Sequence, residues 1–180
     1  MLETLITSKT RLKLLLRFFL NSGTSSYLRN LESEFGESTN AIRLELNRFE
    51  KAGLLISDKE QNRKVYKANK KHPLFPDIQN IIKKYVGFDQ IILSVVEKLG
   101  NIHKAYIAGD LAQGIDTKKI DLFLIGDNID QEYLEHLSLL TADLINRKIN
   151  YKILNPSEEA RFLEKYPGAF LIWTGVDSGK

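Results

Sequence analysis

The stretch "AGDLAQGIDTKKIDLFLIG", residues 108–126, decides how the C-terminal half of the chain folds. Gly109 and Gly114 mark a turn, because glycine adopts the backbone conformations that tight turns need. The apolar run after the turn has the length and composition of a buried strand. It carries one acid, Asp121, two residues after Lys119. The stretch therefore predicts a glycine turn that leads into a core strand with a single carboxylate.

Strands and helices alternate on both sides of this stretch. Apolar runs predict strands at residues 102–108, 120–126, 148–154 and 169–173, and helical periodicity predicts helices at residues 88–100, 130–147 and 156–167. The alternation indicates an α+β or α/β domain around one sheet. The first of these helices has one apolar side, formed by Phe88, Ile91, Ile92, Val95, Val96 and Leu99.

The first half of the chain begins with three predicted helices. Ser8 can cap the first, which ends at Gly23, and the second lies within residues 24–36. Ser38 can cap the third, whose inner stripe is formed by Ile42, Leu46 and Phe49. Its outer face carries side chains that hydrogen-bond to base edges and phosphates, namely Thr39, Asn40, Arg43 and Asn47.

A basic hairpin follows the third helix. Two short apolar-polar runs flank a polar turn at residues 59–62, which predicts two antiparallel strands. Residues 59–71 hold six Lys and Arg against one acid, and residues 1–86 hold 16 against 9. Residues 87–180 hold 10 Lys and Arg against 14 Asp and Glu. The opposite charges indicate two units, of which the basic one is the candidate for a polyanionic partner.

Residues 9–72 resemble the ArsR-type winged helix-turn-helix regulators, with "LRNLESEFGESTNAIRLELNRFEKAGLL" followed by the "RKVYKAN" wing. The resemblance implies a DNA-binding domain over residues 1–72 whose third helix enters the major groove. It assigns base reading to the outer face of that helix and phosphate contacts to Arg63, Lys64 and Lys67. Residues 73–87 are a connector typical of small bacterial regulators in which a winged helix precedes a nucleotidyltransferase-like domain.

Residues 88–180 resemble the minimal nucleotidyltransferase fold, a mixed sheet flanked by helices. That family has a Gly-Ser pair, an Ala-x-Gly turn, an Asp-x-Asp strand and a third acid on a later strand, and its acids bind Mg²⁺. On this sequence the turn matches Gly109, Ala112 and Gly114, and the second aspartate matches Asp121. The serine position is occupied by Asp110, the first aspartate position by Lys119, and the third-acid position by Asn150 or Tyr151.

These departures predict that the domain is not an enzyme and holds no metal or other cofactor. Asp110 would place a negative charge where phosphate lies, and Lys119 would place an ammonium where a divalent cation sits. Asn150 or Tyr151 removes an anionic ligand. Two alternatives remain open: a new metal site formed by Asp110, Asp121 and Asp116, and a retained pocket for an unknown small ligand. The two glycines can also mark nothing more than a tight turn.

Composition limits the remaining classes of function. The chain of 180 residues has no cysteine, which excludes disulfides and thiolate metal sites and fits a cytoplasmic location. Its three histidines, His72, His103 and His136, lack the close spacing of metal ligands. The most apolar stretch, "LKLLLRFFL", is short and interrupted by Lys13 and Arg17, so no membrane span is expected.

The sequence thus predicts a two-domain transcriptional regulator that binds double-stranded DNA and has a catalytically inactive nucleotidyltransferase-like domain for dimerisation or ligand sensing. An active nucleotidyltransferase and an antitoxin-like protein-interaction module are the alternatives. A homodimer is expected because helix-turn-helix proteins usually read paired half-sites. The apolar side of helix 88–99 and the first helix are the expected dimer surfaces, unless both are core.

Overall fold

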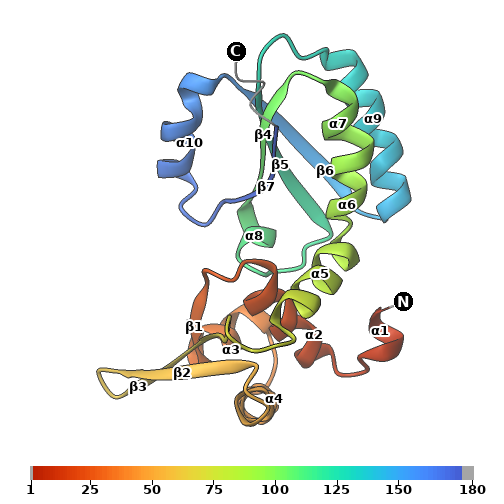
Figure 1. Cartoon of the computed structure of the whole chain (residues 1–180). Coiled ribbons are helices and arrows are strands. Elements are labelled where there is room, and N and C mark those ends of the chain that lie inside the picture. Colours follow the sequence, from red (N-terminus) through yellow and green to blue (C-terminus); the bar gives the residue numbers. More distant parts are fainter. Residues whose placement is uncertain (1, 176–180) are drawn as a thin grey trace. The chain divides into compact units, whose positions relative to one another are not determined.

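The computed structural model describes residues 2–175, which form a mixed α+β fold with two sheets. They divide into two compact units (Figure 1). Unit 1 contains the residues up to 85 together with residues 113–115, and unit 2 contains residues 86–112 and those from 116 onward. Within residues 2–175, no helix is both long and apolar enough to cross a membrane.

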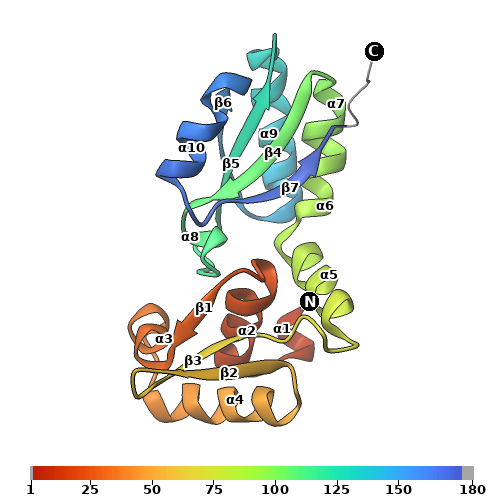
Figure 2. The same ribbon diagram turned by 60° about the vertical axis from the view of Figure 1, so that its left-hand side comes forward.

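Unit 1 consists of helices followed by a hairpin. Its elements are α1 (Leu2–Leu5), α2 (Lys9–Leu15) with a π-helical continuation (Leu16–Leu20), β1 (Ser25–Tyr27), α3 (Leu28–Phe35), α4 (Thr39–Lys51), β2 (Leu55–Glu60), β3 (Arg63–Ala68) and most of α5 (Phe75–Val86). As predicted, Ser8 caps α2, where its side chain accepts a hydrogen bond from the amide of Arg11 at 3.2 Å. The strands form one antiparallel sheet in the order β1-β3-β2 (Figure 2).

Strand β1 corrects the prediction of a helix within residues 24–36. The helix begins only at Leu28, because Ser25, Ser26 and Tyr27 pair with β3. Ser26 is buried in this pairing. A pairing between segments about 40 residues apart in the chain leaves no local pattern that could reveal it.

Unit 2 is built on a four-stranded sheet in the order β6-β5-β4-β7. Its strands are β4 (Ile102–Ala108), β5 (Lys119–Gly126), β6 (Lys148–Leu154) and β7 (Phe170–Thr174). Strands β5 and β6 are parallel, whereas β4 is antiparallel to both β5 and β7. All four strands lie where the apolar runs predict them.

Helices cover both faces of this sheet (Figures 1 and 2). One face carries α9 (Gln131–Ile145) and a continuous helix made of α6 (Phe88–Ile91), a π-helical turn (Ile92–Val96) and α7 (Glu97–Leu99). The other face carries α10 (Glu159–Lys165), which a short 3-10 turn (Pro156–Glu158) precedes. The short helix α8 (Gly109–Ala112) connects β4 to β5.

The expected dimer surfaces are largely core. In helix 88–99, Phe88, Ile91, Val95 and Val96 are buried within unit 2, where this helix packs beside α9. In unit 1, the apolar residues 14–16 and 18–20 of the first long helix are buried as well. These apolar sides are therefore explained by the folding of each unit and do not form free surfaces.

Candidate functional site

The orientation of α4 is set by its cap and its buried stripe. The Ser38 hydroxyl accepts a hydrogen bond from the amide of Ala41 at 3.3 Å, which satisfies a free donor of the first turn. Ile42, Leu46 and Phe49 are buried, as their spacing predicts. Burial of this stripe directs the opposite side of α4 to solvent.

The predicted base-reading residues divide into two groups. Asn40, Arg43 and Asn47 are exposed, and within residues 2–175 their side chains have no hydrogen-bond or ion-pair partner. Thr39 differs, because it is half-buried and its hydroxyl donates to Glu32 Oε1 at 2.6 Å. The structure therefore leaves three of the four side chains available to a partner and uses the fourth to join α3 to α4.

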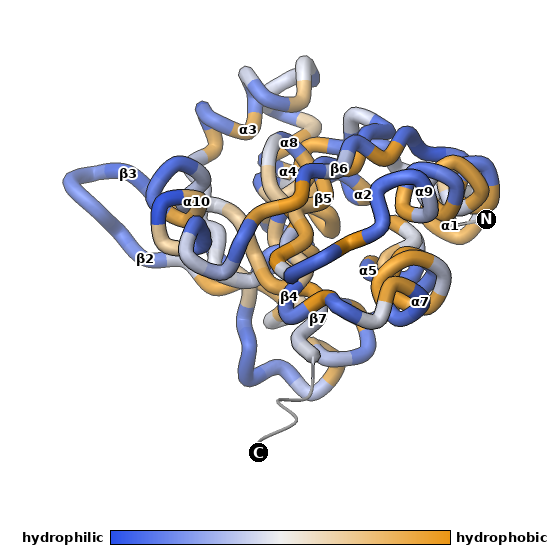
Figure 3. Tube along the Cα trace, turned by 90° about the horizontal axis from the view of Figure 1, so that it is seen from above, coloured by the Kyte–Doolittle hydropathy of each residue, from blue (hydrophilic) through white to orange (hydrophobic). Residues whose placement is uncertain are grey.

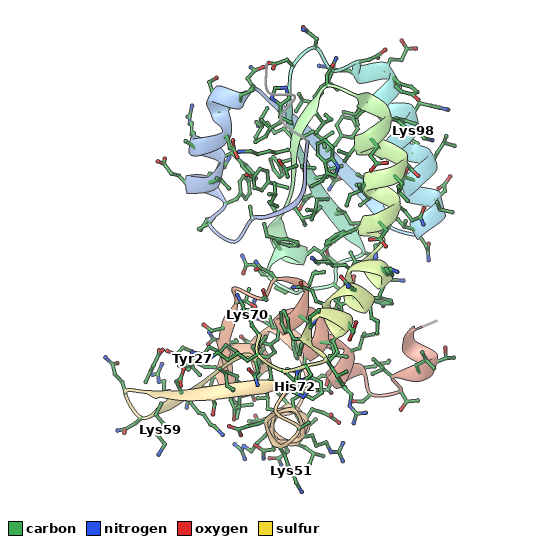
Figure 4. All side chains as sticks on the ribbon, in the orientation of Figure 1. Tyr27, Lys51, Lys59, Lys70, His72 and Lys98 are labelled. Atoms are coloured by element: carbon green, nitrogen blue, oxygen red, sulfur yellow. The ribbon has the colours of Figure 1, made fainter. Side chains whose placement is uncertain are left out.

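Three further side chains share the exposed part of α4. Arg48 and Lys51 are charged, and Leu44 is an apolar residue that is 53% exposed. Lys51 projects from the end of the helix (Figure 4). None of the three was predicted as a contact residue, although helical spacing from Arg43 and Asn47 identifies all of them.

An ion-pair cluster fixes α4 against α2. The carboxylate of Glu45 is only 6% exposed and receives Arg11 Nε at 2.9 Å and Arg48 Nη1 at 2.7 Å. Burial by itself would raise the pKa of Glu45, but the hydrogen bonds and charges of the two arginines outweigh it and lower this pKa below its ordinary value. Glu45 thus holds the candidate reading helix in place while it lies outside the exposed face.

The hairpin of β2 and β3 turns at Gln61 and Asn62, both of which have a left-handed backbone with φ of 44° and 66°. A two-residue turn of this hand matches the twist of paired strands. The loop between the strands is strongly hydrophilic (Figure 3). Lys59 lies near the tip (Figure 4), directly opposite Lys64 in the strand pairing. Like charges placed opposite each other are destabilising unless another group compensates them.

The three predicted phosphate contacts do not share one face of the hairpin. Lys64 lies on the α4 side, where its Nζ pairs with Glu50 at 2.7 Å. Because strand side chains alternate, Arg63 and Lys67 lie on the other side, where Lys67 pairs with Asp58 at 2.6 Å. Lys59, which was not predicted as a phosphate contact, lies on the same side as Lys64 and has no ion-pair partner in the part of the chain that is described.

In unit 2, Gly109, Asp121 and Asn150 come together. A Cβ atom on Gly109 would lie 2.4 Å from Asp121 Oδ2, and Gly109 has a φ of 69°, so this close approach requires glycine. Asn150 stands opposite Asp121 in the parallel pairing of β5 and β6, and its Nδ2 donates to Asp121 Oδ1 at 3.0 Å. Of the two residues expected at the third-acid position, Asn150 is the one that faces Asp121, while Tyr151 pairs with Leu122.

The other motif residues lie apart from this contact. Lys119 and Asp110 are exposed and have no side-chain partner among the described residues. Lys119 is two residues before Asp121 on β5 and so lies on the same face of the sheet. Gly114, with a φ of 80°, belongs with residues 113–115 to unit 1.

Asp116 is bound to an arginine. Its carboxylate receives Arg147 Nη2 at 3.1 Å, and its Oδ1 also accepts from the amide of Lys118. Burial alone would raise the pKa of Asp116, but the hydrogen bonds and charges of Arg147 and Lys118 together outweigh it and hold this pKa below its ordinary value. Asp116 thus orders the segment before β5, and within residues 2–175 no three His, Asp or Glu side chains gather as a metal site would require.

Two adjacent hollows lie on the α10 face of the sheet. The first, of about 200 Å³, is lined by Asp121, Asn150 and Tyr151, and the second, of about 270 Å³, is lined by Arg161 and other residues of α10. They share Phe123, Lys152 and Tyr166 as lining residues. Both hollows therefore border the strand face that carries Asp121.

Comparisons with known proteins give fold similarity only. No protein-family model and no curated protein matches the chain. A candidate nucleotidyltransferase from Sulfolobus solfataricus is 21% identical over 51% of this chain and 81% of that one, with a TM-score of 0.34. A chain from the complex of tri-AMPylated Shewanella oneidensis HEPN toxin with MNT antitoxin is 12% identical. The match covers 49% of this chain and 70% of that one, with a TM-score of 0.36. Sso10a-2, a DNA-binding protein from Sulfolobus solfataricus, is 18% identical. The match covers 51% of this chain and 90% of that one, with a TM-score of 0.34.

The Glu45 cluster predicts a pH-dependent stability. We expect Glu45→Gln to lower the free energy of unfolding at neutral pH by about 1–3 kcal/mol, because it removes a charged acceptor from two arginines. The folded-state pKa of Glu45 is lowered, so its contribution is present above the unfolded pKa and is lost as the pH falls through the folded pKa. Urea unfolding at neutral and acidic pH measures this difference between wild type and variant.

Glu97→Gln is the matched control, because Glu97 is exposed within the continuous helix of residues 88–99 and has no side-chain partner among the described residues. Its effect should be small at both pH values. A Glu45→Gln deficit that stays the same at acidic pH would contradict the assignment of the stabilisation to the ionised carboxylate.

Proposed function

We propose that the chain is a DNA-binding transcriptional regulator. In this proposal unit 1 is a winged helix-turn-helix that binds duplex DNA. Unit 2 is a nucleotidyltransferase-like domain that has lost catalysis and serves dimerisation or ligand sensing. The order of elements in unit 1 supports the first assignment, because α3 and α4 form two successive helices joined by a short turn and the hairpin follows as the wing.

The exposed face of α4 is the observation that carries the proposal. Asn40, Arg43 and Asn47 are the side-chain types that read adenine and guanine edges, and no partner in the described chain occupies them. The wing adds the unpaired positive charge of Lys59 on the strand face that also carries Lys64, whose own charge Glu50 neutralises. A reading helix beside a cationic strand pair suits a duplex, whose phosphates flank its grooves.

Arg43→Ala should reduce sequence discrimination. A bidentate arginine–guanine contact contributes about 1–3 kcal/mol of discrimination, so the ratio of specific to non-specific affinity should fall by about tenfold or more. Fluorescence anisotropy with the duplex upstream of the chain's own gene and with a scrambled duplex measures this ratio. Lys98→Ala, an exposed charge of unit 2 (Figure 4), is the control and should leave the ratio unchanged.

Wild-type protein that binds no duplex in a salt-dependent way would overturn the proposal. Discrimination that survives in Arg43→Ala would instead show that α4 is not the reading element.

Lys59→Ala and Arg63→Ala should separate the two faces of the wing. Loss of one phosphate contact weakens binding to all duplexes alike and reduces the log–log salt slope by about one unit. We expect this from Lys59→Ala, and in the same direction from Lys64→Ala. Arg63→Ala removes an equal charge from the opposite side of the hairpin and should have a smaller effect. An anisotropy salt series measures all three, and a larger slope change for Arg63→Ala would reverse the assignment of the faces.

The residues around Asp121 support an inactive unit 2. The Asn150 amide occupies Asp121 Oδ1, Lys119 brings a positive charge to the same sheet face, and Asp116 is bound to Arg147. A metal site of the nucleotidyltransferase type needs several carboxylates that converge. We therefore infer that Asp121 acts here as a hydrogen-bond acceptor.

With Mg²⁺ or Mn²⁺, each nucleoside triphosphate and a set of acceptors, the protein should release pyrophosphate no faster than its Asp121→Ala variant. The physical reason is that a lone carboxylate holds a divalent cation poorly. A coupled pyrophosphate assay makes the comparison. Release that depends on Asp121 would favour the alternative of an active nucleotidyltransferase.

A protein-docking role for unit 1 is the second candidate function. It is favoured by Leu44, a half-exposed leucine in the middle of the α4 face that would otherwise read DNA. Exposed apolar side chains at the centre of a surface are typical of protein interfaces. In that case unit 1 would be an antitoxin-like interaction module, and the wild-type chain would show no salt-dependent affinity for any duplex.

A further inference from the structure

Unit 2 carries a group of cations that no carboxylate of the described chain neutralises. Lys152 of β6 and Arg161 and Lys165 of α10 line the same hollow of about 270 Å³. All three are exposed, and none forms an ion pair with another described residue. Residues 87–180 hold 10 Lys and Arg against 14 Asp and Glu, so the overall charge of this half does not account for the cationic hollow.

The three cations are arranged unfavourably unless an anion lies between them. Arg161 and Lys165 are four residues apart on α10, so they lie on the same side of this helix and repel each other. Lys152 lines the same hollow from the sheet. One carboxylate, that of Glu158, also lines the hollow, and it accepts a hydrogen bond from the amide of Asn155 at 2.9 Å. The excess of positive charge suits an anionic group that accepts several charge-assisted hydrogen bonds.

The neighbouring hollow of about 200 Å³ is lined by aromatic rings and by hydrogen-bonding groups. Phe123 and Tyr166 line both hollows, and their ring centroids are 5.2 Å apart. Asp121 and Asn150 line this hollow as well. The side-chain amide of Asn150 donates to Asp121 Oδ1 at 3.0 Å, while its carbonyl oxygen has no partner among the described residues. The hollow therefore offers aromatic faces for stacking and an acceptor for an N–H group.

The two hollows lie side by side, because they share Phe123, Lys152 and Tyr166 as lining residues. Together they reach the range of small-molecule sites, which is about 300–1,000 Å³. We propose that they bind a nucleoside monophosphate without a metal ion. The base lies in the aromatic hollow, where Asn150 accepts from its amino group, and the phosphate lies among the three cations.

A terminal phosphate suits the cationic hollow better than the backbone of a nucleic acid does. A phosphomonoester carries about 1.5 to 2 negative charges at pH 7, whereas each backbone phosphate carries one. The cations neutralise the phosphate directly, so binding needs no magnesium. The inference rests on the ligand-sensing role proposed for unit 2 and names the class of ligand.

Isothermal titration calorimetry of the full chain in EDTA tests the site, with AMP as the probe. AMP should bind, and adenosine and inorganic phosphate should each bind more than about tenfold more weakly, because each fills one of the two hollows. A short single-stranded oligonucleotide without terminal phosphates should also bind more weakly than AMP. Wild-type protein that binds no AMP would overturn the proposal. An oligonucleotide that binds more tightly than AMP would overturn it as well and would assign the surface to a nucleic-acid strand.

Two lysines of β6 provide a matched pair of variants. Lys152→Ala should raise the dissociation constant of AMP by about tenfold or more, because it removes a charge-assisted hydrogen bond to the phosphate. Lys148→Ala removes the same charge from the same face of β6, but Lys148 lines neither of the two hollows. Four residues of a strand span about 13 Å, which exceeds the Debye length of about 8 Å at physiological ionic strength, so this variant should bind AMP as wild type does.

Equal effects of the two lysine variants would overturn the position assigned to the phosphate. Affinity that appears only with Mg²⁺ and disappears in Asp121→Ala would overturn the metal-free mode of binding. Calorimetry with AMP and anisotropy with duplex DNA measure separate properties. A chain that binds duplex DNA but no AMP would therefore refute this inference and leave the role of unit 1 standing.

Discussion

Strand β5 directs its side chains alternately to two faces of the four-stranded sheet, and the arrangement of unit 2 depends on this alternation. Ile120, Leu122 and Leu124 are fully buried. On the other face, Asp121 meets Gly109 and Asn150, and two residues later Phe123 packs on Phe162 of α10 with ring centroids 4.6 Å apart. A shift of β5 by one residue would place the carboxylate in the core, so the position of Asp121 at the hollow is tied to the packing of the whole sheet.

In unit 1, by contrast, carboxylates of the same unit neutralise part of the positive charge. The segment of residues 59–71 is strongly basic by composition, yet Glu50 and Asp58 pair with Lys64 and Lys67. Exposed pairs of this kind are worth little in stability, but they fix where the lysine heads lie. The charge available to a polyanion is consequently set by the cations that the carboxylates leave unpaired, and among the described residues of the hairpin Lys59 is such a cation on the strand face of Lys64.

The order of elements was predictable because it rests on local patterns: caps at Ser8 and Ser38, the stripe of α4, and the apolar strands of unit 2. The features that were not predicted depend on contacts between distant segments of the chain. Strand β1 exists because β3 pairs with it. The Thr39 hydroxyl is not available to a partner because it donates a hydrogen bond to Glu32. The choice between Asn150 and Tyr151 required the register of β5 and β6, which periodicity alone leaves undetermined.

The hydrogen bond between Asp121 and Asn150 needs no cation to balance it. Two carboxylates at hydrogen-bonding distance repel each other, so one must take up a proton or both must share a metal ion. The amide of Asn150 brings no such requirement, because its N–H group donates directly to Asp121. The chain therefore satisfies this contact by itself, and the close packing of Gly109 on Asp121 still requires glycine.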